Sequence, residues 1–308
     1  MPLPTACPLC NKGREHQNVV TPHVYSGRDN QAFFQCMSCD VIYLFPPLNL
    51  EEQSEFYAKE FENFMENRSN GVIWKTPETH VTENAYQFTR RLKYLNDYLP
   101  KPGGRILEVG CSSGFMLIPL QKKGFECIGI EPSGAFSEFL TSNDILSFKS
   151  KEEFATSDEA KDHFDLIMHF FVLEHISTPE EFIAEQLILL KPGGKLIIEI
   201  PNAADALSTI YNIPAFERFY WSVAHNWYFT KKSFAYVLEQ TEQPYEILLD
   251  QRYDLSNHFQ WALDGRPGGA KRFTPKLGLE IEEQYKMALI KAEKCDTLIG
   301  VINKPMEQ

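Results

Sequence analysis

The segment RILEVGCSSGFMLIPLQKKG constrains the fold of this 308-residue chain more than any other. A short apolar run, residues 106–109, leads into Gly110-Cys-Ser-Ser-Gly114 and then into a helix-like stretch. Glycines at a turn from strand to helix let the backbone come close to a ligand. The spacing differs from the G-x-G-x-x-G of dinucleotide sites. The segment therefore predicts a buried strand followed by a cofactor-binding turn.

Strand-like and helix-like segments alternate after this turn. ECIGI is followed by Glu131, 21 residues after Gly110, where a carboxylate is placed to accept hydrogen bonds from a ribose diol. HFDLIMHF and KLIIEIPN read as strands, with the helix-like TPEEFIAEQLILL between them and Thr178 as its cap. Upstream, ETHVTENAYQFTRRLKYLNDYL has the three-to-four spacing of one amphipathic helix. Alternating strands and helices predict a parallel α/β sheet.

Two Cys-x-x-Cys pairs stand in the first fifty residues: Cys7 and Cys10, then Cys36 and Cys39. Each pair places two thiolates on one tight turn, and four such ligands suit tetrahedral zinc. A redox pair is the alternative, but these pairs are duplicated and neither lies at a strand-to-helix junction. The pattern predicts a closed, structural zinc ribbon whose charges cancel, which favours packing against protein over phosphate contacts.

The composition restricts the partners. There are 42 acidic and 30 basic residues, a formal charge of −12, so nucleic acid and anionic membranes are not favoured. No run of 18 apolar residues and no secretory signal occurs, which makes a cytoplasmic location the default expectation. The expected organisation is a zinc ribbon over residues 1–50, a helical lead-in over 51–100 and a main domain over 101–308, with insertions at about 202–230 and 254–296.

The ordered series ILEVGCSSG, Glu131, FDLIMHFFVLEHI and LKPGGKLIIEIPN resembles the motifs of class I S-adenosylmethionine-dependent methyltransferases. The resemblance covers roughly residues 80 to 240. It implies an α/β fold: a seven-stranded Rossmann-like sheet with an antiparallel last strand, here with an N-terminal zinc ribbon and a C-terminal helical insertion. PYEILLDQRYD and DTLIGVINK fit the final two strands. The implied cofactors are S-adenosyl-L-methionine and structural Zn²⁺.

Carried over residue by residue, the resemblance implies a set of cofactor contacts that begins at the glycine turn and ends after the fourth strand. For Phe170 and Phe171, packing in the core is an equal alternative. The set consists of Glu108, Gly110, Cys111, Gly114, Phe115, Glu131, Pro132, Ser150, His169, Phe170 and Phe171.

Two histidines are candidates for the catalytic base, because methylation of a hydroxyl requires a group that accepts its proton. His175 follows the fourth strand, and His225 lies in SVAHNWYFT after the fifth. The alternative for His225 is a hydrogen-bonded residue in an aromatic wall. The expected substrate contacts are Tyr57, Asn226, Trp227, Tyr228, Asn257, His258 and Trp261.

The ribbon and the segment VAHNWYFT are similar to sugar methyltransferases that act on nucleotide-linked deoxysugars. Ala224 stands where those C-methyltransferases have a glutamate, and Val223 replaces their first histidine. The absence of this glutamate weakens the case for a carbon acceptor. It favours O-methylation of a sugar, nucleotide-sugar or surface-glycan precursor, with His225 as general base. The alternatives are C- or N-methylation of a nucleotide-linked deoxysugar, methylation of RNA, and a cofactor-binding subunit without activity.

Overall fold

The computed structural model describes residues 2–49, 51–52, 56, 76–161 and 163–306. Within this part, two sheets are present, one of seven strands and one of four. Every helix in the described ranges is too short or too polar to span a lipid bilayer.

The larger sheet has the predicted topology. Its strand order is β10-β11-β8-β7-β4-β5-β6, and β11 runs antiparallel to both of its neighbours while the other neighbouring pairs are parallel. The expected Rossmann-like sheet with an antiparallel last strand is confirmed. The strands are β4 (Arg105–Val109), β5 (Glu126–Ile130), β6 (Leu146–Phe148), β7 (Phe164–Phe170), β8 (Leu190–Pro201), β10 (Tyr245–Asp250) and β11 (Thr297–Asn303).

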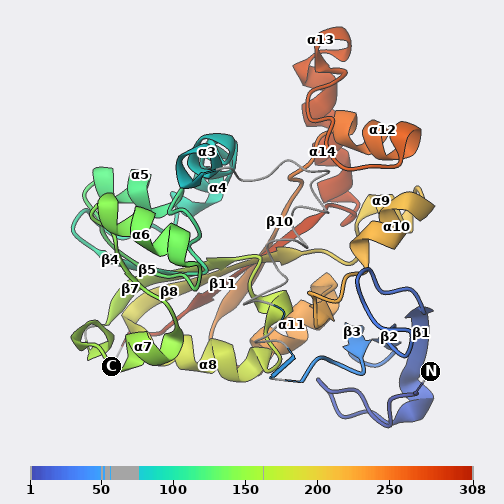
Figure 1. Ribbon diagram of the computed structural model, residues 1–308, viewed down its shortest axis with the longest axis horizontal. Helices are drawn as coiled ribbons and strands as arrows, with labels where there is room; N and C mark the ends of the chain where they lie inside the picture. Colours follow the sequence, from blue (N-terminus) through green and yellow to red (C-terminus); the bar gives the residue numbers. More distant parts are fainter. Residues whose placement is uncertain (1, 50, 53–55, 57–75, 162, 307–308) are drawn as a thin grey trace.

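Helices cover both faces of this sheet (Figure 1). One face carries α3 (Pro77–Glu83), α4 (Ala85–Leu95), α5 (Leu117–Lys122) and α6 (Gly134–Ser142). The other carries α7 (Lys151–Ala155), α8 (Pro179–Leu189) and α11 (Lys231–Glu239). Because side chains alternate along a strand, β7 contributes Leu166, Met168 and Phe170 to the first face and Ile167 to the second.

The single amphipathic helix that we expected before the sheet is two helices. The break is at Asn84, whose side-chain amide donates to the carbonyl of His80 at 2.8 Å. Asparagine competes in this way with the hydrogen bonds of a helix interior, which explains the break. The rest of the predicted lead-in, residues 51–100, lies partly outside the described residues.

The smaller sheet joins the ribbon to the main domain. Strands β1 (Gln17–Thr21), β2 (Ala32–Cys36) and β3 (Ile42–Phe45) come from the ribbon, and β9 (Trp227–Tyr228) is the fourth strand. Ile42 pairs with Tyr228 and Tyr43 with Trp227. The strand β9 belongs to the segment SVAHNWYFT, so the ribbon braces the loop that carries His225.

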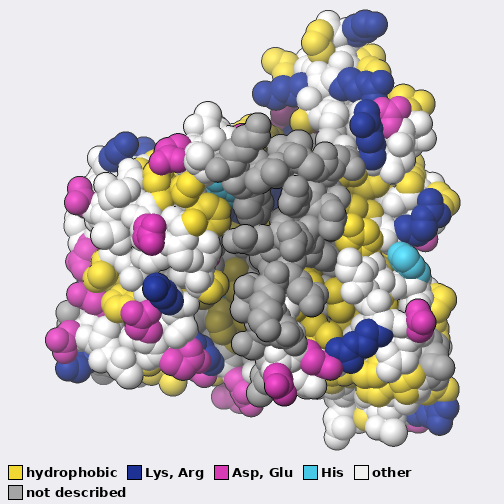
Figure 2. All heavy atoms as spheres, viewed as in Figure 1, with side chains coloured by type: hydrophobic (Ala, Val, Ile, Leu, Met, Phe, Trp, Pro, Cys, Tyr) yellow, Lys and Arg dark blue, Asp and Glu magenta, His cyan; other side chains and the backbone are white. Residues whose placement is uncertain are grey.

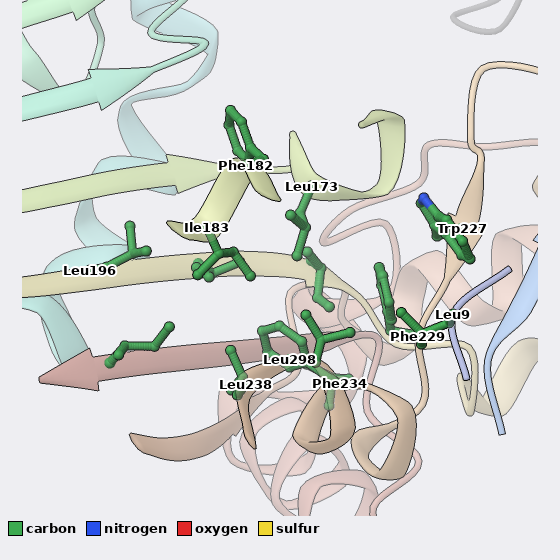
Figure 3. Close-up of a cluster of buried hydrophobic side chains, with 14 of the residues drawn as sticks. Leu9, Leu173, Phe182, Ile183, Leu196, Trp227, Phe229, Phe234, Leu238 and Leu298 are labelled. Atoms are coloured by element: carbon green, nitrogen blue, oxygen red, sulfur yellow. The ribbon is translucent and has the colours of Figure 1, made fainter. Parts of the chain in front are cut away.

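One hydrophobic cluster runs without interruption from the ribbon into the main sheet (Figure 3). Leu9 and Trp227 lie at its ribbon end, Phe229, Phe234 and Leu298 lie in the middle, and Leu196 of β8 lies at the sheet end. The ribbon therefore shares its core with the main domain, as its neutral charge indicated.

The two predicted insertions fold into different sets of elements. The first contains α9 (Ala206–Thr209), α10 (Pro214–Tyr220) and β9. The second contains α12 (Leu255–Asp264), α13 (Thr274–Leu277) and α14 (Leu279–Lys291), which project from the molecule as an arm (Figure 1). Lys and Arg side chains gather on this arm (Figure 2).

We expect Tyr228→Phe to destabilise the fold. The Tyr228 hydroxyl is buried, donates to the carbonyl of Tyr220 and accepts from the N–H of Ser222 at 3.0 Å. Loss of bonds to buried backbone groups should lower the free energy of unfolding by about 1–3 kcal/mol, measured by urea denaturation. The control Tyr245→Phe, which removes a surface hydroxyl bonded to Glu239, should change it by less than about 0.5 kcal/mol. Equal stability of the two variants would contradict the structural role assigned to the buried Tyr228 hydroxyl.

Candidate functional site

The glycine turn after β4 has the close-packed geometry that its sequence predicts. Gly110 and Gly114 have φ angles of 72° and 70°, which favour glycine. A Cβ on Gly114 would lie 2.5 Å from Leu140, and one on Gly110 would lie 2.8 Å from Val172. Neither position accommodates a larger side chain without movement of its neighbour.

Glu131, at the end of β5, is tied directly to this turn. Its carboxylate accepts from the N–H of Ser112 at 2.7 Å and from the N–H of Ser133 at 2.8 Å. Burial raises the pKa of Glu131, and the two N–H bonds act in the opposite direction. The carboxylate therefore has a fixed position between the glycine turn and the start of α6, beside the exposed Pro132.

Glu108 lies at the carboxyl end of β4 and is fully buried. Its Oε2 has no hydrogen-bond partner among the described residues. Burial raises the pKa of Glu108 well above its usual range, against the nearby charge of Arg91. Beside the turn, this group retains an acceptor for a ligand.

Other predicted cofactor residues have structural contacts of their own. The Cys111 side chain faces the core, where a Cβ on Gly129 would lie 2.4 Å from its Sγ. The Cys111 N–H donates to the carbonyl of Ile130 at 3.2 Å. The Ser150 hydroxyl caps α7 by accepting from the N–H of Glu153 at 3.1 Å. Phe115 packs 5.8 Å from the ring of His80.

The three residues predicted after the fourth strand point in different directions. The Arg91 guanidinium lies over the Phe170 ring at 3.9 Å, and that of Arg252 lies 4.6 Å from Phe171. His169 points to the opposite face, where its ring packs 5.3 Å from Phe182 of α8. Burial lowers the pKa of His169 to about 3. The side chain of His169 is therefore a neutral core group in this structure.

His80 adjoins the site and was not predicted. Its Nδ1 lies 2.7 Å from the Ser113 hydroxyl in the glycine turn, and burial lowers its pKa to about 4. His80 lies in α3, before the break at Asn84, and its ring also packs 5.2 Å from that of Phe136 in α6. The sequence offers no local signal for His80, because its partner Ser113 lies 33 residues later.

A buried ionic cluster anchors α4 on the sheet and was also missed. Glu199 of β8 binds Arg91 at 3.1 Å, Arg90 at 2.5 Å and the Tyr94 hydroxyl. Burial alone would raise the pKa of Glu199, but the charges of Arg91 and Arg90 outweigh it and lower the pKa to about 2. The acidic residue inside KLIIEIPN and the pair of arginines in the preceding helix were the available signals.

The two candidate catalytic histidines lie side by side, with ring centroids 4.8 Å apart. His175 ends the short 3-10 helix η4 (Leu173–His175) after β7, and His225 precedes β9. The ligand atoms of both lie within 4.8 Å of each other and of a Glu174 carboxylate oxygen. Burial raises the pKa of Glu174 to about 8. The structure thus brings together residues fifty positions apart.

Backbone contacts hold this histidine pair in place. His175 Nδ1 lies 2.6 Å from the carbonyl of Ala224, which accepts a hydrogen bond from it. The Asn226 side chain donates to the carbonyl of His175 at 2.7 Å, and the Trp227 indole donates to that of Ile176 at 2.7 Å. These two side chains and Tyr228 are buried, so their observed contacts are with protein, and their predicted contacts with substrate stay predictions.

The remaining predicted substrate residues lie in the arm or outside the described residues. Asn257 donates to the carbonyl of Gly268, His258 Nδ1 lies 2.6 Å from the Tyr285 hydroxyl, and Trp261 packs on Phe216. Among the described residues, His258 is not one of those whose ligand atoms gather at the histidine pair. Trp261 shares a buried hydrophobic cluster with Ala224 and Tyr228, on either side of His225. Tyr57 lies outside the described residues.

The four ribbon cysteines converge. Cys7 Sγ lies 3.7 Å from Cys39 Sγ, and Cys10 Sγ lies 3.5 Å from Cys36 Sγ. In a tetrahedral zinc site with bonds of 2.3 Å, sulfur atoms lie about 3.8 Å apart. Hydrogen bonds from Cys39 and from the N–H groups of Cys10 and Leu9 lower the pKa of Cys7 to about 5, against its burial. The donor set and its spacing fit Zn²⁺.

Two hollows among the described residues differ in their position relative to the main sheet. One, of about 600 Å³, is lined by residues such as Gly104, Asp165 and Gly193 at the amino ends of the strands, away from the glycine turn. The other, of about 250 Å³, lies between the ribbon and the first insertion and is lined by Gln31, Val223 and neighbouring residues. Ligands of parallel α/β sheets bind at the carboxyl ends of strands, so the first hollow is not the candidate site.

We expect His169→Leu to make the free energy of unfolding depend less on pH below pH 6.5. A histidine whose folded pKa is lowered stabilises the protein above pH 6.5 and loses this contribution as the pH falls toward 3. Between pH 6.5 and pH 5, the wild type should lose about 2 kcal/mol more free energy of unfolding than the variant. Urea denaturation at several pH values measures the difference. Parallel pH dependence in the two proteins would contradict the assignment.

The segment that resembles known proteins includes both the glycine turn and the histidine pair. A family model described as a methyltransferase domain matches residues 81–242, more than half of the chain. The ubiquinone biosynthesis O-methyltransferase of Bradyrhizobium sp. (strain ORS 278) is 25% identical over 128 residues, 40% of this chain and 49% of the relative. That of Coxiella burnetii (strain Dugway 5J108-111) is 29% identical over 118 residues, 36% of this chain and 50% of the relative.

The chain thus spans about half the length of the curated relatives it matches. Among solved structures, a SAM-dependent methyltransferase from Archaeoglobus fulgidus is 18% identical, with a TM-score of 0.49 over 80% of this chain and all of that one. The family match, which covers the glycine turn, Glu131 and both histidines, shows that the chain belongs to the methyltransferase domain family.

Proposed function

We propose that the protein transfers a methyl group from S-adenosyl-L-methionine to a hydroxyl oxygen of a small-molecule acceptor. The observation that carries this proposal is the placement of two groups along one edge of the sheet. The glycine turn lies at the carboxyl end of β4, and Glu131 lies at that of β5. His175 follows the carboxyl end of β7, and the His225 ring lies beside it.

The cofactor side of the site rests on the glycine turn. The backbone of residues 110–114 would approach the methionine part of the cofactor, and Glu131 would accept from the ribose hydroxyls. Its carboxylate is already oriented by the N–H groups of Ser112 and Ser133. When bound, the cofactor supplies a methyl group made electrophilic by its sulfonium. The protein must therefore position the acceptor oxygen and remove its proton.

His225 is the proposed general base, and His175 supports it. The His175 Nδ1 donates to the Ala224 carbonyl, which leaves its lone pair on Nε2 while the ring is neutral. That carbonyl belongs to the residue before His225, so this hydrogen bond fixes the His175 ring against the backbone next to His225. A half-buried imidazole suits proton acceptance near neutral pH because its ordinary pKa is about 6.5.

Oxygen as the methylated atom is supported by the relatives, which are named O-methyltransferases. A sugar, nucleotide-sugar or surface-glycan precursor as acceptor rests on the sequence resemblance alone. We further propose that Cys7, Cys10, Cys36 and Cys39 hold a structural Zn²⁺. All four of its positions would be filled by thiolates, so the ion would stabilise the ribbon and take no part in methyl transfer.

We expect His225→Ala to lower kcat by about 10²–10⁴-fold, the usual contribution of a general base, and to leave the affinity for S-adenosylhomocysteine unchanged. Turnover is measured with labelled S-adenosylmethionine and a panel of phenols and nucleotide-linked sugars, and affinity by calorimetry. His16→Ala, an exposed ribbon histidine, is the control and should behave as wild type. Full turnover in the His225 variant would contradict the base assignment, and no transfer by the wild type to any member of the panel would count against these acceptor classes.

A further inference from the structure

The cluster around Glu174 has the composition of a transition-metal site. One carboxylate and two imidazoles contribute ligand atoms that all lie within 4.8 Å of one another. Imidazole and carboxylate ligands suit divalent first-row ions such as Co²⁺, Ni²⁺ and Zn²⁺. Glu174 and His175 arrive from η4, and His225 arrives from the loop before β9. The ribbon cysteines form a separate cluster.

Glu174 itself has an unsatisfied oxygen. The residue is 1% exposed, and its Oε2 has no hydrogen-bond partner among the described residues. A buried carboxylate normally pairs with a cation or binds a metal, because an isolated charge in the interior is costly. The charge of Arg252 acts on Glu174, but no salt bridge joins the two within the described part of the chain.

The surroundings of His175 are those of a metal-binding histidine. Its Nδ1 donates to the carbonyl of Ala224, which directs Nε2 away from the backbone. Histidine ligands of metals almost always donate their other ring N–H to a carbonyl, a carboxylate or water. The Asn226 N–H also donates to the carbonyl of Glu174 at 2.9 Å, so the backbone of η4 is held on both sides of the cluster.

The size of the cluster requires only a small adjustment. Two ligand atoms bound to one ion at about 2.0–2.1 Å lie at most about 4 Å apart. Separations of up to 4.8 Å must therefore shorten by at most about 1 Å for all three ligands to bind one ion. Both histidines are half-buried, which leaves the cluster accessible to an ion from solution.

We propose that Glu174, His175 and His225 bind a divalent transition-metal ion, with a consequence that rests on the function proposed above. The ion takes the lone pair with which His225 would accept the acceptor's proton. Occupancy of this cluster therefore inhibits methyl transfer, and the ion competes with the base. The site is thus regulatory, and it is distinct from the structural zinc of the ribbon.

The test is a titration of the zinc-loaded protein with Co²⁺, followed by calorimetry and visible absorption. Since the ribbon is filled, the added Co²⁺ should bind once per chain and show no thiolate charge-transfer absorption. Glu174→Gln and His225→Gln should each weaken binding by at least about tenfold, because loss of even an outer partner costs 10–100-fold. His16→Gln, a ribbon histidine outside the cluster, is the matched control. Unchanged affinity for S-adenosylhomocysteine verifies that the variants are folded.

The outcomes separate this inference from the proposed function. Binding that both variants lose, with turnover falling as Co²⁺ occupies the site, supports both. Binding that both variants lose, with turnover rising instead, supports the metal site but overturns both the assignment of His225 as the base and the proposed inhibition. Absence of Co²⁺ binding, or binding that neither variant weakens, overturns the metal site and leaves the proposed methyl transfer intact.

Discussion

The pairing of β9 with β3 is the interaction on which the acceptor side of the molecule depends. It consists of two residue pairs, Ile42 with Tyr228 and Tyr43 with Trp227, extended by a hydrogen bond from the Leu44 N–H to the Asn226 carbonyl at 3.0 Å. Such a short strand has little stability of its own. It is held because Trp227 and Phe229 are buried in the core that the ribbon shares with the main domain (Figure 3).

This pairing is connected to the candidate site by hydrogen bonds from one loop. The Asn226 side chain bonds the carbonyl of His175, and the Ala224 carbonyl accepts from the ring of the same histidine. The ribbon is thereby linked, through five residues of one loop, to both candidate catalytic histidines. In the proposed function, the ribbon contributes no group to the reaction but controls the position of the base through this loop. On the cofactor side, the ion cluster of Glu199 holds α4 against β8 and so keeps Arg91 over Phe170.

Sequence reasoning succeeded where the signal is local. The strands of the main sheet, the glycine turn and the four converging cysteines follow from spacing within short segments, and the structure has them. The pairing of β9 was not predicted because its partner strand lies about 180 residues earlier in the chain. In addition, a strand of only two residues is too short to show an alternating hydrophobic pattern. For Trp227, Tyr228 and Trp261, aromatic side chains suit a pocket wall and a core equally, and only the fold shows that they are buried. His169 was also ambiguous from the sequence, because a shift of one residue along a strand moves a side chain to the opposite face of the sheet.

The most direct test of this account compares one preparation before and after zinc is removed from the ribbon. Turnover and S-adenosylhomocysteine affinity are measured on both, and again after zinc is restored. The account predicts that turnover falls by at least about tenfold, since misplacement by 1 Å can cost about 10²-fold, while the affinity stays within about twofold. Restored zinc should restore turnover. Full turnover in the zinc-free protein would contradict the claim that the ribbon positions His225.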